Sequence, residues 1–182
     1  MSDLFKKTSK IVVSGNGGIG KTTLVKTFCY NQYFDNQKLT LGSEFFFKRA
    51  QINDRTIDLQ IWDFVGEDRF RFLLPDFIQG AEGASLRFDV KRRNSFLDLK
   101  KWVPLLRKHN PHLPIVMLGL KKDLGYHSML GSKMVKKFVK KFDLVNFIEV
   151  SSKENLNVDL LFKYLIQNIE ECDIESIKFI DS

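Results

Sequence analysis

Residues 15–22 of the chain read Gly-Asn-Gly-Gly-Ile-Gly-Lys-Thr, with the spacing G-x-x-x-x-G-K-T. The apolar residues 11–13 precede this stretch, and a helical pattern follows it from Leu24 onward. Glycines let the backbone curl so that successive N–H groups face one anion, and the start of the next helix adds its positive dipole end. The stretch therefore predicts a strand, a phosphate-binding loop and a helix, with a nucleoside triphosphate as ligand.

Within this motif, Lys21 is expected to reach the β- and γ-phosphates, and the Thr22 hydroxyl is expected to bind Mg²⁺. A glycine turn that binds nothing is the alternative, but the strand–loop–helix context argues against it. Lys21 is also a candidate catalytic residue. The candidate phosphate-binding residues are Gly15, Gly17, Gly18, Ile19, Gly20, Lys21, Thr22 and Thr23.

The chain has 182 residues, enough for one domain with a sizeable core. Its content of 43% hydrophobic and 28% charged residues is typical of soluble globular proteins, and no apolar run approaches the ~20 residues of a membrane span. The net charge is +7, from 29 basic and 22 acidic residues, which suggests attraction to anionic surfaces but does not predict a nucleic-acid partner. Two cysteines make no disulfide framework and fit a reducing cytosol.

Strand and helix patterns alternate along the chain, with one hairpin signal at residues 53–54. They predict a single α/β domain over residues 1–182, with a six-stranded, mostly parallel sheet, one antiparallel strand and helices on both faces. The expected strands span residues 10–14, 45–52, 56–62, 84–90, 115–120 and 147–150. The expected helices span residues 21–31, 95–108 (kinked at Pro104), 132–142 and 157–171, with a loop and helix at 63–80.

In such a sheet, ligands bind at the carboxyl ends of the strands. Asp63 ends one strand and can hold Mg²⁺ through water, while Gly66 can bring its N–H against a γ-phosphate. After the strand at 115–120, Asp123 can accept two hydrogen bonds from the guanine edge, and the stem of Lys121 can lie across the base. Ser151, Ser152 and Lys153 end the last strand and leave room for a base.

Together these features resemble the Ras-like small GTPases of the P-loop NTPase fold, and among them the Rab branch, over about residues 8–172. Residues 62–70, Trp-Asp-Phe-Val-Gly-Glu-Asp-Arg-Phe, resemble the Rab stretch W-D-T-A-G-Q-E-R-F. The resemblance implies that Thr40 binds Mg²⁺ and senses the γ-phosphate, and that Tyr33 lies against the guanine. It also implies a partner-facing aromatic triad of Phe45, Trp62 and Phe77.

By this resemblance we expect a GTP-binding switch that hydrolyses GTP to GDP with Mg²⁺, in Rab-like trafficking or membrane-related regulation. Switch segments at about residues 35–44 and 64–78 would contact effectors, exchange factors and GTPase-activating proteins. We expect a cytoplasmic monomer. Two alternatives stay open: a nucleotide-bound interaction module with little hydrolysis, and another P-loop enzyme such as an ATPase or a small-molecule kinase.

Two residues depart from the family. Glu67, a candidate catalytic residue, stands at the position of the glutamine that orients the attacking water; its charge could slow hydrolysis, or it could act as a base. Leu120 stands where the family has an Asn or Thr that ties the base loop to the phosphate loop, so we expect weaker nucleotide affinity with Asp123 keeping the selectivity.

The last four residues carry no prenylation box, so either the sequence stops short of a lipidation signal or the protein is not lipidated. The basic helix at residues 132–142 could attract an anionic membrane weakly, although an ordinary solvated helix face explains the same lysines.

Overall fold

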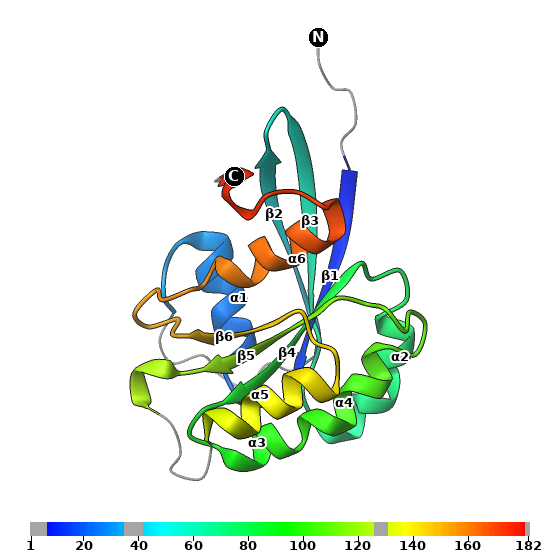
Figure 1. Ribbon diagram of the computed structural model, residues 1–182, viewed down its shortest axis with the longest axis vertical. Coiled ribbons are helices and arrows are strands. Elements are labelled where there is room, and N and C mark those ends of the chain that lie inside the picture. The colour runs from blue at the N-terminus through cyan, green and yellow to red at the C-terminus, as the bar shows by residue number, and fades with distance from the viewer. Residues whose placement is uncertain (1–6, 35–41, 126–130, 181–182) are drawn as a thin grey trace.

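In the computed structural model, which describes residues 7–34, 42–125 and 131–180, seven strands form one sheet with helices on both faces (Figure 1). The strand order is β6-β5-β4-β1-β3-β2-β7. The strands are β1 (Lys7–Gly15), β2 (Glu44–Ile52), β3 (Arg55–Asp63), β4 (Gly83–Asp89), β5 (Ile115–Leu120), β6 (Asn146–Val150) and β7 (Ile177–Ile180). The helices are α1 (Lys21–Tyr30), α2 (Leu74–Phe77), α3 (Arg93–Leu97), α4 (Leu99–Leu106), α5 (Ser132–Lys141) and α6 (Leu160–Glu170), and a 3-10 helix (Asp68–Leu73) precedes α2.

The sheet has one strand more than the six we expected. β7 pairs antiparallel with β2, placing Phe179 opposite Ala50. The prediction failed because β7 is only four residues long and its partner lies far away in the sequence, so no local pattern reports the pairing. The expected single antiparallel strand is confirmed: β2 runs against both of its neighbours, β3 and β7.

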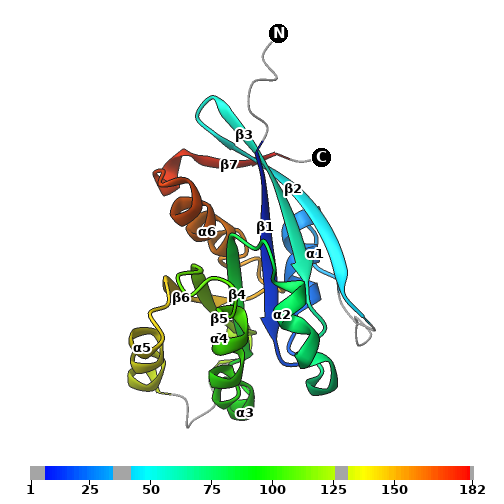
Figure 2. The same cartoon turned by 90° about the vertical axis from the view of Figure 1, so that its right-hand side faces the viewer.

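Burial follows from the position of each strand. β4 and β5 lie inside the sheet and are buried along their whole length, as expected for parallel strands covered on both faces. β2 and β3 instead alternate between buried and more exposed side chains. One core cluster lies under α1 and α6, and a second lies under α2, α3, α4 and α5 on the other face (Figures 1 and 2).

The helix expected at residues 95–108 is interrupted. α3 and α4 are separated at Asp98, whereas Pro104 stays inside α4, so the interruption is not where the proline predicted a kink. The Asp98 carboxylate accepts a hydrogen bond of 2.9 Å from the side chain of Asn16 in the glycine loop. The break between α3 and α4 therefore places the Asp98 carboxylate within hydrogen-bond distance of the glycine loop.

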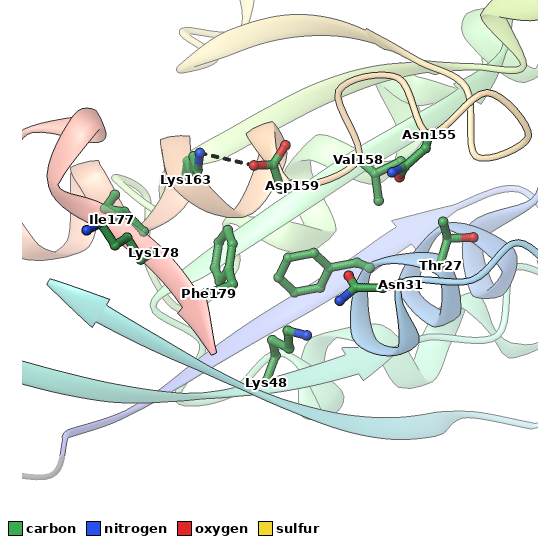
Figure 3. A pocket seen from close by; sticks show the side chains of 11 residues that line it. Thr27, Asn31, Lys48, Asn155, Val158, Asp159, Lys163, Ile177, Lys178 and Phe179 are labelled. Atoms are coloured by element: carbon green, nitrogen blue, oxygen red, sulfur yellow. Dashed lines mark ion pairs between the residues drawn. The ribbon is translucent and has the colours of Figure 1, made fainter. Parts of the chain in front are cut away.

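Lys48 of β2 points into the core beside α1 (Figure 3). Its ammonium donates to the Cys29 carbonyl at 3.2 Å, in the last turn of a helix that has no basic residue there. Lys48 thus brings positive charge to the negative end of the α1 dipole. It also lines a pocket of about 520 Å³ between α1, β2, α6 and β7, where Lys163 pairs with Asp159 at 3.0 Å. Among the described residues, no helix has the length and hydropathy to cross a membrane.

Candidate functional site

The predicted site residues follow the carboxyl ends of strands that all run the same way. β3, β1, β4, β5 and β6 are parallel, so their ends meet at one edge of the sheet. In the register, Val13 lies opposite Asp63, Gly15 opposite Arg87, and Leu120 opposite Val150. The sheet thereby gathers the glycine loop, Asp63 and the segments after β5 and β6.

The glycine loop is held close to the sheet. Gly15 has a φ of +130°, and a Cβ at this position would lie 2.5 Å from the Arg87 carbonyl oxygen, so only glycine fits here. The loop ends where α1 begins, with the N–H of Leu24 donating to the Gly20 carbonyl at 3.1 Å. The backbone thus enters the first turn of a helix at the point where an anion is expected to bind.

Lys21, the first residue of α1, is buried, and its ammonium donates to the Asn16 carbonyl at 2.9 Å. Burial lowers the pKa of Lys21 to about 8, and the nearby charge of Asp63 opposes this shift. At neutral pH the site therefore holds a cation that is poorly solvated, which is the condition that favours an incoming phosphate.

Thr22 and Asp63 meet beside this lysine. The Thr22 hydroxyl donates to Asp63 Oδ2, while Asp63 Oδ1 is buried without a hydrogen-bond partner among the described residues. Burial raises the pKa of Asp63, with Lys21, the Thr22 hydrogen bond and Arg87 acting in the opposite direction. A hydroxyl and a carboxylate with a free oxygen are the hard oxygen ligands that Mg²⁺ prefers, so the two residues fit this metal. Thr40, the third predicted ligand, lies outside the described residues.

Gly66 lies directly on the glycine loop. A Cβ at Gly66 would lie 2.5 Å from the Gly15 carbonyl oxygen and would collide with the Lys21 ammonium. The next residue, Glu67, is also close, because a Cβ on Gly17 would be 3.9 Å from its Cγ. The Glu67 carboxylate pairs with Arg69 at 2.7 Å. The structure therefore brings Gly66 and Glu67 to the phosphate loop.

A second hollow, of about 270 Å³, lies at the other end of this edge. Asp123 lines it, and Asp123 Oδ1 accepts a 2.6 Å hydrogen bond from the Ser151 hydroxyl, which fixes the carboxylate. The cavity has a volume just below the range of about 300–1,000 Å³ that is typical of small-molecule sites. Its lining includes the predicted residues Ile19, Gly20, Thr23, Tyr33, Lys121, Asp123, Ser152 and Lys153, together with Leu120.

Lys121 is anchored from beneath the pocket. Its ammonium pairs at 2.7 Å with Asp89, a residue at the end of β4 that is 1% exposed. No site role was predicted for Asp89. Leu120, buried at 3% exposure, lines the pocket with a side chain that has no hydrogen-bonding group.

The three aromatic residues predicted to face partners do contact one another. Phe45 lies edge-on to Trp62 with ring centroids 4.6 Å apart, and Trp62 lies 5.0 Å from Phe77. Lys10 places its ammonium 3.5 Å from the Trp62 ring centroid. Phe45 is 54% exposed, so the cluster is open to solvent on the outer face of β2 and β3.

Comparison with known proteins agrees with this geometry. The family model described as "Ras family" matches residues 10–171. The chain belongs to the Ras family. It is 30% identical over 181 residues to the Ras-related protein Rab7 of Drosophila melanogaster, covering 97% of this chain and 87% of that protein. It is 33% identical over 161 residues to the Ras-related protein Rab11A of Nicotiana tabacum, covering 88% and 74%.

A third Rab-type relative is the Ras-related protein YPTC6 of Chlamydomonas reinhardtii, 32% identical over 174 residues, with 95% of this chain and 79% of that protein covered. The chain is thus a Ras-family small GTPase related to the Rab proteins, and family membership implies a GTP-binding switch that takes GTP or GDP with Mg²⁺. Membership also implies exchange factors, GTPase-activating proteins and effectors as partners.

In this small GTPase, Asn16 has a role that sequence reasoning missed. Its side chain donates to Asp98 at 2.9 Å and accepts from the indole N–H of Trp102 at 3.0 Å. Both partners belong to the α3–α4 segment, so Asn16 ties the glycine loop to this segment. The motif leaves position 16 open to any residue, and therefore the motif could not report the contact.

We expect Asn16→Ala to lower the free energy of unfolding by about 1–3 kcal/mol, because the fully buried Trp102 loses its hydrogen-bond acceptor. Urea denaturation followed by tryptophan fluorescence measures this loss. Asn94→Ala, at an exposed position of α3, is the matched control and should stay within about 0.5 kcal/mol of the native protein. Equal losses in the two variants would contradict the assigned role.

Proposed function

We propose that this small GTPase hydrolyses GTP to GDP with Mg²⁺ and signals its nucleotide state through segments at about residues 35–44 and 64–78. The observation that carries the proposal is the meeting of two sites at one sheet edge. At one end lie Lys21, Thr22 and Asp63, and at the other lies a pocket with a fixed carboxylate, Asp123.

At the phosphate end, the Lys21 ammonium and the loop N–H groups would bind the β- and γ-phosphates. Thr22, Asp63 and Thr40 would hold Mg²⁺, which when bound neutralises charge on the phosphates. The Gly66 N–H would meet the γ-phosphate, because Gly66 already lies against the loop. The residues proposed for phosphates and metal are Gly15, Gly17, Gly18, Ile19, Gly20, Lys21, Thr22, Thr23, Thr40, Asp63 and Gly66.

At the base end, Asp123 would accept hydrogen bonds from the paired N–H and NH₂ groups of guanine, which adenine does not offer. The Ser151 hydroxyl holds one oxygen of this carboxylate, which limits its rotation. Tyr33 and the stem of Lys121 would flank the purine, and Ser152 and Lys153 would complete the pocket.

We further propose that partner proteins bind the surface formed by Phe45, Trp62 and Phe77. Phe45 follows the first proposed switch segment in sequence, Phe77 belongs to the second, their rings lie 6.2 Å apart, and Phe45 is exposed. We also propose that the protein acts in Rab-like, membrane-related regulation, as a cytoplasmic monomer that meets membranes peripherally; its similarity to Rab proteins supports this. Its single domain would span residues 1–182, with a core at about 8–172.

The test of this function is to denature the purified protein and identify the released nucleotide by chromatography. We expect stoichiometric GDP or GTP, because Asp123 selects guanine and Lys21 retains the phosphates. Release of ATP or ADP would overturn the assignment of Asp123 and would favour another kind of P-loop enzyme.

A second candidate function, a nucleotide-bound interaction module with little hydrolysis, is favoured by Glu67. Its carboxylate pairs with Arg69 and cannot donate an N–H to the transition state. In either case we expect intrinsic hydrolysis to be slow.

Replacing Glu67 by Gln should raise the single-turnover rate constant of GTP cleavage about tenfold or more, because an amide donor replaces a negative charge beside the phosphates. Rapid-quench measurement of released phosphate provides the rate. Glu175→Gln, on the exposed segment before β7, is the control for loss of one carboxylate. A Glu67→Gln variant that is no faster than the native protein would show that the carboxylate does not slow the reaction.

Leu120→Asn should tighten GDP binding about 2–10-fold, because an amide can restore a hydrogen bond worth about 0.5–1.5 kcal/mol between the base loop and its surroundings. Calorimetric titration with GDP and with ADP measures affinity and selectivity together. Leu124→Asn makes the same change at an exposed residue of the same pocket and should not tighten binding. Unchanged or weaker GDP affinity for Leu120→Asn would refute the idea.

A further inference from the structure

Arg87 is a charged residue in the most enclosed part of the fold. It belongs to β4, where every residue is buried, and its own exposure is 0%. Its neighbours in sequence, Leu86 and Phe88, belong to the core cluster on the side of α2, α3 and α4. By alternation Arg87 faces the other side, beneath α1. Arginine is almost never fully buried unless a specific partner compensates its charge.

The partners of Arg87 place it under the phosphate loop. Its Nη1 donates to the Lys21 carbonyl at 3.0 Å, and its Nε donates to the Ser85 hydroxyl at 3.0 Å. Its Nη2 is buried and has no hydrogen-bond partner among the described residues. Burial lowers the pKa of Arg87 to about 10, and the charge of Asp63 opposes this shift. Arg87 is therefore still a cation at neutral pH.

Asp63 lies on the same face of the sheet as Arg87, because β3 places Asp63 opposite Val13 of β1 and β4 places Arg87 opposite Gly15, two residues further along β1. Among the described residues, Asp63 is the one carboxylate whose charge raises the pKa of Arg87. Asp63 is itself 1% exposed and experiences the positive charges of both Lys21 and Arg87. The two cations differ in one respect. The Lys21 ammonium lies on the loop, where phosphates are expected, whereas Arg87 is enclosed by β4 and the first turn of α1.

We propose that Arg87 is a positioning residue of the phosphate site, a permanent counter-charge to Asp63 that keeps the nucleotide bound when Mg²⁺ is absent. Lys21 can pair with phosphates, and Arg87 then remains to offset the carboxylate. Without Arg87, the negative charge of Asp63 would face the phosphates unopposed whenever the metal is gone.

The same charge acts in opposite directions on the two ligands of the site. A buried cation attracts the phosphates and repels Mg²⁺, and both interactions are strong because little solvent screens them. Removing the charge should therefore speed nucleotide release without metal and strengthen metal binding. The ratio of the release rate in EDTA to the release rate in excess Mg²⁺ reports both effects at once.

This inference rests on the proposed function, so the experiment uses the full chain loaded with a fluorescent N-methylanthraniloyl-GDP. Release is followed after addition of excess unlabelled GDP, in EDTA and in excess MgCl₂. Arg87→Gln removes the charge and keeps an N–H donor, whereas Arg87→Lys keeps the charge and loses the fork of donors. We expect the rate ratio to rise about tenfold or more in Arg87→Gln, and to stay within about threefold of the native value in Arg87→Lys.

The proposal is overturned if the rate ratio of Arg87→Gln equals that of the native protein. It is also overturned if the rate ratio rises as much in Arg87→Lys as in Arg87→Gln, because the effect would then come from lost hydrogen bonds and not from lost charge. If Arg87→Gln does not fold, Arg87→Met removes the charge and keeps an apolar side chain of similar length in this enclosed position. Its rate ratio should also rise about tenfold or more, and a ratio equal to the native one contradicts the proposal. A native protein that binds no labelled GDP in either buffer refutes the proposed function as well, whereas the other failures concern Arg87 alone.

Discussion

Burying one carboxylate, that of Asp63, constrains much of the surrounding structure. A carboxylate at 1% exposure needs compensation, and it comes from the Thr22 hydroxyl and from the charges of Lys21 and Arg87. These groups belong to α1 and β4, whereas Asp63 ends β3. They can meet only because β1 lies between β3 and β4 and carries the glycine loop at its own end. The charge cluster around Asp63 therefore depends on this strand order.

The buried polar residues of β4 extend this arrangement toward the base pocket. Ser85, Arg87 and Asp89 occupy alternate positions of the strand, so they share one face, and all three are buried. Arg87 contacts the start of α1, and Asp89 pairs with Lys121 at the base pocket. One strand thus supports both halves of the site from below. Asp89 thus anchors Lys121 directly after Leu120, whose side chain cannot hydrogen-bond.

The parts of the site that could be predicted are those that short sequence patterns indicate. The glycine loop, Asp63 and Asp123 each follow a recognisable strand, and parallel strands bring their ends together, so their meeting followed from the fold class. The Arg87 and Asp89 contacts could not be predicted, because a charged residue inside a short apolar strand shows no partner until the sheet is assembled. The hydrogen bonds of Asn16 depend on Asp98 and Trp102, which are distant in sequence. The interruption at Asp98 could not be predicted for the same reason, since within this helix pattern only Pro104 signals an irregularity in the local sequence.

The pairing of β7 with β2 has a consequence for the exposed edge of the sheet. β2 and β7 lie far apart in the sequence, so their pairing forms only when folding has brought the two segments together. Until then the edge of β2 from Arg49 to Ile52 stays open, next to the exposed rings of Phe45 and Phe47. An open, apolar strand edge invites pairing with other chains. β7 therefore covers part of a strand edge that would otherwise be prone to aggregation.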